Sequence, residues 1–333
     1  MLTLHPARLL FTITLLTGAL IALSSSSWFT AWMGLELNLL SFIPLISSKS
    51  NLYSSEAALK YFLIQALGSS IILASAPALL LLSMSPNLMI LSALLLKMGA
   101  APVHFWFPSV MQGIGWLQCI ILMTVQKIAP MLMISYLVTS GTASIMFLSS
   151  ILSSLVGGLG GLNQTLVRKI MAYSSINHMA WMLAAIFVNT PLWANYFLIY
   201  SIVSSSVVAI MHSQQIFHFK QASNLTNQST LLKISMLFSL LSLGGLPPFL
   251  GFMPKLMIIQ AMIANGFGVW LLVLLFSALI TLFYYLRITM MSMTLSSPKT
   301  KSTTLTPFNS LLGSISFINL TPLLTPLIIF LPF

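Results

Sequence analysis

The chain has 333 residues, of which 58% are hydrophobic and only 5% are charged, and its mean hydropathy is +1.02. A soluble domain carries about 25% charged residues, so this composition excludes a soluble protein and predicts an all-α polytopic membrane protein. The net charge of +11 comes from 13 Lys and Arg against two Glu. Basic loops gathered on one side of a membrane explain this excess better than nucleic-acid binding does.

Windows of about 20 apolar residues predict eleven transmembrane helices. They lie at approximately 7–26, 28–47, 55–82, 87–107, 116–138, 143–162, 165–188, 191–213, 233–263, 268–292 and 310–331. The first has the outline of a signal peptide, but the hydrophobic segments that follow favour a retained helix. The ninth is too long for one straight helix, and a Gly-Gly-Leu-Pro-Pro run interrupts it, which predicts a broken helix.

The basic residues of the loops all fall on the side of the N-terminus when eleven spans are counted. They are Arg8, Lys49, Arg168, Lys169, Lys220, Lys233, Lys299 and Lys301. The loops on the opposite side contain no Lys or Arg. Because positive charge stays inside, the N-terminus is expected in the cytoplasm or its organellar equivalent, and the C-terminus on the opposite side.

Seven charged residues remain within the predicted spans. Three of them have ordinary explanations: Arg287 is near the inner end of its span and can extend to the interface, while Glu56 and Lys60 are four residues apart and can form a structural ion pair.

Glu36, Lys97, Lys127 and Lys255 are different, because each is close to the centre of its span. Each costs roughly 2.5–3.5 kcal/mol at that depth, so four cost on the order of 10 kcal/mol. Two buried ion pairs fit poorly, since three lysines face one glutamate. A polar path for protons through the centre of the membrane is the better hypothesis.

Residues that weaken helices accompany each of the three lysines. They are Gly99 and Pro102 after Lys97, Pro130 after Lys127, and Gly244, Gly245, Pro247, Pro248 and Pro254 before Lys255. A proline frees the carbonyl four residues before it, and free carbonyls at membrane depth are tolerated only against protein or water. His178, inside the seventh span, can bridge protonatable groups, although a lone histidine is more often simply hydrogen-bonded.

Other chemistries are poorly supported. The single cysteine, Cys119, excludes a disulfide within the chain and any iron–sulfur or zinc site built from its own cysteines. There is no GxGxxG and no P-loop, and the five histidines do not supply facing pairs for a haem. We therefore expect no cofactor and no metal on this chain.

At these residues the chain resembles the subunit 2 family of mitochondrial NADH–ubiquinone oxidoreductase (respiratory complex I), a family of antiporter-like, proton-translocating membrane subunits. The stretches that carry the resemblance are 32–38 (WMGLELN), 56–62 (EAALKYF), 94–106, 126–130 (QKIAP), 161–165 (GLNQT), 168–178 and 242–255. The segment 296–333 matches weakly.

The resemblance implies roles for the buried charges. Glu36 and Lys97 match the family's Glu–Lys pair, which gates proton uptake and carries coupling between subunits. Lys127 matches the central lysine, Lys255 the terminal lysine on a broken helix facing the exit side, and His178 a histidine on the central hydrophilic axis.

The resemblance also implies the architecture and the setting. One antiporter-like domain, 1–333, would contain two inverted five-helix repeats, each with a broken helix. The first, approximately 28–162, is truncated at its N-terminal side; the second is approximately 165–292, and a terminal helix follows at 310–331. The protein would lie in the mitochondrial inner membrane with its N-terminus in the matrix and its C-terminus in the intermembrane space. Its partners would be other membrane-arm and accessory subunits and lipids including cardiolipin, with no nucleic acid.

NADH, FMN, iron–sulfur clusters and ubiquinone would be bound by other subunits of the complex. Two alternatives stay open at this point. One is a free-standing cation/proton antiporter, and the other is a structural scaffold subunit without a proton path of its own.

Overall fold

The computed structural model describes residues 6–47, 51–78, 85–227 and 230–294, together with Ser316 and Asn319. Its regular structure is helical in this part of the chain, apart from an isolated bridge between Leu166 and His218. The chain divides into two compact units, Met1–Ser153 and Ser154–Phe333. The boundary falls inside a helix, about nine residues before the predicted limit of the first repeat at approximately 162.

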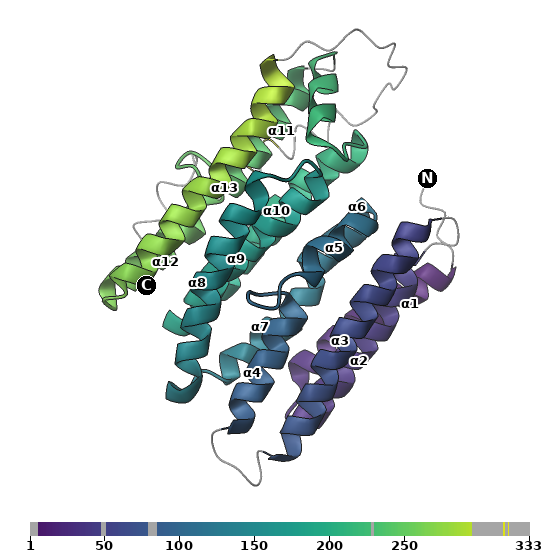
Figure 1. Ribbon diagram of the computed structural model, residues 1–333, viewed down its shortest axis with the longest axis vertical. Coiled ribbons are helices and arrows are strands. Elements are labelled where there is room, and N and C mark those ends of the chain that lie inside the picture. The colour runs from purple at the N-terminus through teal and green to yellow at the C-terminus, as the bar shows by residue number, and fades with distance from the viewer. Residues whose placement is uncertain are drawn as a thin grey trace. The chain divides into compact units, whose positions relative to one another are not determined.

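The first unit contains seven complete helices and the beginning of an eighth among its described residues (Figure 1). They are α1 (Pro6–Ser24), α2 (Trp28–Ile46), α3 (Leu52–Ala78), α4 (Ser85–Met98), α5 (Trp106–Gly113), α6 (Trp116–Met123), α7 (Val125–Tyr136) and the start of α8 (Ser140–Leu162). Helices α1 and α2 pack closely because glycines lie at their contact: a Cβ on Gly34 would come within 2.6 Å of the backbone nitrogen of Ala22. Helix α3 packs in turn against α2, α4 and α5.

The second unit is organised around α9 (Val167–Val188), which is buried along almost its whole length. Besides the end of α8, the other elements are α10 (Thr190–Ser213), the 3₁₀ helix η1 (Phe219–Asn227), α11 (Thr230–Gly244), α12 (Phe252–Ala264) and α13 (Gly268–Thr294). Helices α10, α12 and α13 all pack against α9. A helix that is apolar on all sides is expected at the centre of such a bundle.

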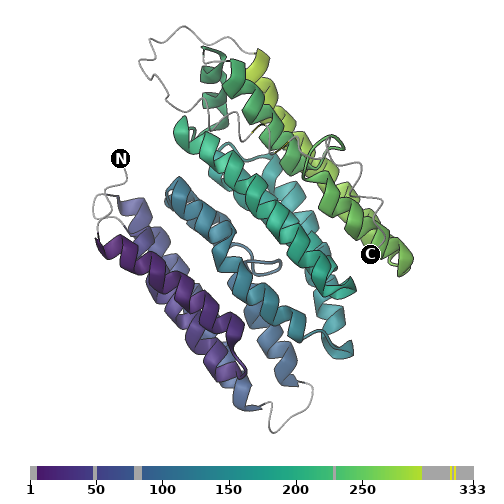
Figure 2. The ribbon, with the colours of Figure 1, turned by 180° about the vertical axis from the view of Figure 1, so that it is seen from behind.

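Eight of the described helical segments are long and apolar enough to cross a membrane, counting α6 and α7 together as one segment. The fourth and ninth predicted spans instead form pairs of shorter helices, α4 with α5 and α11 with α12. The loop between α4 and α5 lies about halfway along its neighbours in the first unit (Figures 1 and 2). The eleventh predicted span lies outside the described residues except for two positions, so eleven helices and inverted repeats stay predictions.

Two of the predicted helix breaks need correction. Helix α7 continues through Pro130, and the interruption comes instead at Thr124, between α6 and α7. The carbonyl that the Pro130 ring approaches is that of Gln126, four residues before it, and Gln126 also lies within α7. Pro254 is the third residue of α12, in the first turn, where the missing N–H has no helical partner to lose. The break in this region runs from Gly245 to Gly251.

Candidate functional site

Lys97 lies one residue before the C-terminal end of α4. Gly99 follows with φ of +73°, a left-handed conformation that glycine adopts without strain. The carbonyl of Leu96 accepts hydrogen bonds from the backbone N–H of Gly99 (3.1 Å) and from Trp106 Nε1 (3.0 Å), and the amide of Gln65 donates to the carbonyl of Lys97 (3.0 Å). The break is therefore a capped helix end, and its carbonyls form the negative end of the α4 dipole.

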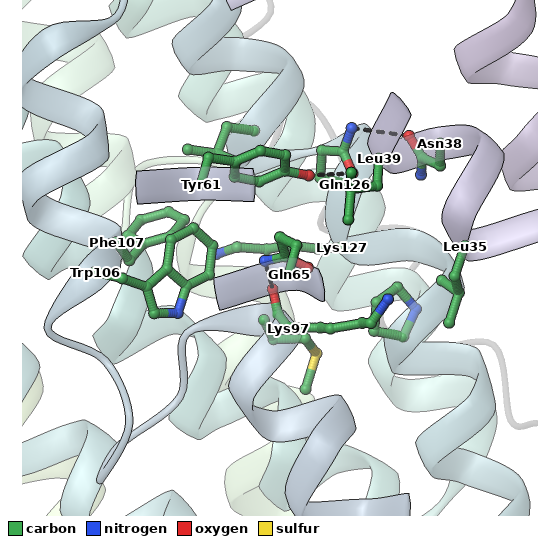
Figure 3. A pocket seen from close by; sticks show the side chains of 13 residues that line it. Leu35, Asn38, Leu39, Tyr61, Gln65, Lys97, Trp106, Phe107, Gln126 and Lys127 are labelled. Atoms are coloured by element: carbon green, nitrogen blue, oxygen red, sulfur yellow. Dashed lines mark hydrogen bonds between the residues drawn. The ribbon is translucent and has the colours of Figure 1, made fainter. Parts of the chain in front are cut away.

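Lys97 and Lys127 line the same internal cavity of the first unit (Figure 3). The cavity measures about 20 Å³, which is room for about one water molecule. The lysines are only 6% and 1% exposed. The ammonium group of Lys127 lies 5.0 Å from the centre of the Phe107 ring, a cation–π contact, whereas Lys97 extends toward α2.

A chain of polar side chains crosses the top of this cavity as it is seen in Figure 3. The amide of Gln126 donates to Asn38 Oδ1 (2.8 Å) and accepts a hydrogen bond from the Tyr61 hydroxyl (3.2 Å). These three residues come from α7, α2 and α3. The cavity that holds the two lysines therefore has a polar wall, which an apolar core would not provide.

Glu36 lies on α2 and is half-buried. Its carboxylate acts electrostatically on Lys97. The direct ion pair found among the described residues is between Glu56 and Lys60, so Glu36 and Lys97 interact at longer range. The aliphatic part of Lys97 packs against Gly68 of α3, where a Cβ would come within 3.0 Å of the lysine Cγ.

In the second unit, Lys255 closes the break between α11 and α12. Its ammonium group donates a hydrogen bond of 2.8 Å to the carbonyl of Gly244, the last residue of α11, and lies 5.8 Å from the centre of the Trp181 ring. Gly245 has φ of +77°, and a Cβ there would lie 2.8 Å from the Lys255 nitrogen. The cation is therefore held at the negative end of a half-helix.

His178 faces the same break from α9. Its Nδ1 shares a hydrogen bond of 2.7 Å with the Tyr196 hydroxyl, and its ring centre lies 5.0 Å from that of Tyr200. It lines a cavity of about 10 Å³ together with Ser242 and Pro254, which lie on either side of the interruption. The second unit thus brings a protonatable ring close to the segment that Lys255 caps.

The remaining charges inside the predicted spans have structural partners. Lys60 pairs with Glu56 at 2.6 Å on an exposed face of α3, a type of pair that contributes about 0–1 kcal/mol. Arg287 donates to the carbonyls of Leu162 (2.8 Å) and Gln164 (2.9 Å), which anchors it at the end of α8. Within the described ranges, no cluster of three or more His, Cys, Asp or Glu could hold a metal ion.

The sequence reasoning concentrated on charges and missed the amides around them. Asn38, Gln65 and Gln126 are all within predicted spans, and in the structure they bond to each other or to the end of α4. These amides could have been identified from the sequence, because a polar side chain inside a transmembrane span is costly unless it is hydrogen-bonded.

The sequence and the fold match known proteins along most of the chain. The family described as "NADH:quinone oxidoreductase/Mrp antiporter, TM" matches residues 25–85 and 78–281. The NADH-ubiquinone oxidoreductase chain 2 of Anopheles gambiae is 47% identical over 93% of this chain and 92% of its own length, and that of Loxodonta africana is 38% identical over 88% and 87%.

Two solved assemblies contain chains of similar fold. A chain of respiratory complex I from Thermus thermophilus has a TM-score of 0.85 at 24% identity, covering 97% of this chain and 79% of the other. A chain of the Mrp complex from Dietzia sp. has a TM-score of 0.77 at 18% identity, covering 90% and 62%. The chain therefore belongs to the NADH:quinone oxidoreductase/Mrp antiporter family of membrane proteins, among the NADH-ubiquinone oxidoreductase chain 2 sequences.

Proposed function

We propose that this chain is a core membrane-arm subunit of respiratory complex I that carries or relays protons across the mitochondrial inner membrane. The transfer of electrons from NADH to ubiquinone, with its FMN and iron–sulfur clusters, takes place in other subunits. The chain is then part of an H⁺-translocating oxidoreductase without a redox centre of its own. The observation that carries the proposal is the cavity in which Lys97 and Lys127 lie buried beneath a polar wall.

Protons move through the first unit by way of Glu36, Lys97 and Lys127. The cavity has room for about one water molecule, which can pass a proton between groups that do not touch. Charges about 10 Å apart, the spacing of packed helices, interact by about 1.7 kcal/mol at an effective dielectric near 20. Proton gain at one lysine therefore favours proton loss at the other, and alternating occupancy needs no redox group.

In the second unit, Lys255 and His178 continue the path. The ammonium group of Lys255 is stabilised by the Gly244 carbonyl and by the end of α11. Proton loss from Lys255 would remove the charge that strengthens this hydrogen bond and so weaken the contact that holds the interruption. Lys255 is then the terminal lysine on the exit side. His178 is the relay, and it lines the small cavity together with Pro254, the residue before Lys255.

The relatives and the distribution of basic loop residues support a location, an orientation and a set of partners. The subunit is a multi-pass protein of the mitochondrial inner membrane, with its N-terminus in the matrix and its C-terminus in the intermembrane space. It contacts other membrane-arm and accessory subunits and membrane lipids including cardiolipin. We expect it to bind no cofactor, metal or nucleic acid of its own.

Replacing Lys97→Met in the assembled complex tests the proposal. The change keeps the length of the side chain and removes the charge, so we expect assembly to persist while proton transport coupled to NADH oxidation falls severely in reconstituted vesicles. Lys60→Met is the matched control. It makes the same substitution at a lysine that forms an exposed ion pair with Glu56, so it should leave pumping unchanged.

Two outcomes would favour other functions. Unchanged pumping by the Lys97→Met complex would indicate a scaffold subunit. Migration of the chain only outside a large assembly on blue-native gels would indicate a free-standing cation/proton antiporter.

A further inference from the structure

The second unit contains a row of buried hydroxyl groups that leads away from His178. We propose that this hydroxyl row conducts protons between the basic end of the second unit and His178. The inference rests on the proposed function, since it supplies protons to the path through Lys255. The row consists of Tyr196, Tyr200, Ser175, Ser174, Tyr285 and Tyr284.

Contacts join several neighbouring members of the row, and Tyr200 also interacts electrostatically with Tyr285. The Tyr196 hydroxyl is hydrogen-bonded to His178 Nδ1 at 2.7 Å. The Tyr200 hydroxyl interacts with Ser175, and that of Tyr285 interacts with Ser174. The ring centres of Tyr284 and Tyr285 lie 4.8 Å apart.

The spacing of the residues explains why these hydroxyls gather at one place in the second unit. Ser174 and Ser175 precede His178 by one turn of α9, and Tyr196 precedes Tyr200 by one turn of α10. Helices α9 and α10 pack against each other, so the hydroxyls of one can face those of the other. Tyr285 reaches the same group from α13, which also packs against α9.

Burial indicates that the hydroxyls serve more than packing. Tyr284, Tyr285 and Ser175 are fully buried, and the other members of the row are 2–4% exposed. Phenylalanine and alanine would fill the same space without bringing polar atoms into the membrane. The hydroxyls of Tyr284 and Tyr285 interact with each other, and that of Tyr285 also interacts with Ser174, so neighbouring oxygens are available to hand a proton on.

The two ends of the row lie at chemically suitable places. At one end, His178 lines the cavity beside the interruption between α11 and α12. At the other, Tyr284 packs over Gly161, where a Cβ would come within 2.6 Å of its ring. Gly161 is one residue before the end of α8, where Arg287 binds. The sequence predicts that the loop after α8, which contains Arg168, lies on the matrix side.

Each hydroxyl oxygen in the row gains one proton and loses one during transfer. A proton arriving from the matrix side forms a new O–H bond at a lone pair of one hydroxyl, while the original O–H bond breaks and its proton passes to the next group. His178 accepts the last proton on a ring nitrogen. Each hydroxyl then turns back to its starting orientation, and no electron is transferred.

Tyr285→Phe is the direct test, because it removes one hydroxyl from the middle of the row and keeps the ring. In purified complex reconstituted into vesicles, we expect the number of protons moved per NADH to fall to the level of a Lys255→Met complex. Tyr136→Phe removes a hydroxyl from an exposed tyrosine of the first unit and should leave this number unchanged. Blue-native electrophoresis of each variant establishes that the complex has assembled.

A second variant guards against a merely structural effect. Ser174→Ala should lower the proton yield to the same level, and the double variant Tyr285→Phe/Ser174→Ala should be no worse than either single one, because all three interrupt one row. A proton yield equal to that of the unmodified complex in both single variants would overturn the proposal. If the two single variants pump normally while Lys97→Met abolishes pumping, the hydroxyl row is rejected and the proposed function stands. If Lys97→Met also pumps normally, the proposed function is rejected as well.

Discussion

Gly245 offers a test of how Lys255 is held, because a single methyl group there perturbs both the backbone and the lysine. Its φ of +77° would cost an alanine about 1–2 kcal/mol. The added Cβ would lie 2.8 Å from the Lys255 nitrogen and 2.9 Å from its Cδ. The side chain must therefore move and lose its hydrogen bond to Gly244, which is worth about 1.5–3 kcal/mol for a charged donor. We expect Gly245→Ala to destabilise the second unit by about 3–5 kcal/mol.

Gly266 provides a matched control for this substitution. It has the same φ of +77°, but no atom of the described residues other than its chain neighbours lies within 4 Å of the position where a Cβ would be. Gly266→Ala should therefore show only the backbone cost, about 1–2 kcal/mol. The assay is thermal inactivation of proton-coupled NADH oxidation by the purified complex, together with the proton yield per NADH before heating.

The difference between the two variants isolates the contact with Lys255. We expect Gly245→Ala to inactivate at a lower temperature than Gly266→Ala and to pump fewer protons per NADH at temperatures where both are intact. Equal inactivation temperatures and equal proton yields would refute the reasoning that the Lys255–Gly244 hydrogen bond holds the interruption together.

Three further substitutions test other contacts. Gly68→Ala should cost about 1–3 kcal/mol by overpacking against the Lys97 side chain and should lower the proton yield, whereas Gly158→Ala, where a Cβ meets its nearest atom at 3.5 Å, should change neither stability nor yield. Gln65→Leu should cost about 1–3 kcal/mol by removing a donor to the end of α4, measured by thermal inactivation; an unchanged inactivation temperature would contradict this. Arg287→Met should lower thermal stability by about 2 kcal/mol or more, since it removes two hydrogen bonds from a charged donor, but should leave the proton yield of the intact complex unchanged; a lower yield would place Arg287 in the path.

The buried charges were evident from the sequence because of what a membrane does to charge. Lys97, Lys127 and Lys255 are conspicuous in apolar spans, and the structure finds each of them at most 6% exposed. The breaks at Gly99 and at Gly245 were also predictable, since glycine and proline act on the backbone locally. Pro130 shows the limit of this reasoning, because α7 continues through it and the helix is interrupted six residues earlier, at Thr124.

The partners of these charges were decided only by tertiary structure. Gln126 reaches Asn38, 88 positions away, and Gln65 of α3 reaches the carbonyl of Lys97 at the end of the neighbouring helix α4. Hydropathy records that a side chain is polar, but not which face of a helix it shares with a residue of another helix. The sequence alone determined that this is a membrane protein with an improbable number of buried cations, because the cost of a charge in lipid depends on composition and depth. Tertiary structure decided which amides, carbonyls and hydroxyls surround those cations, because hydrogen bonds between helices depend on how the helices pack.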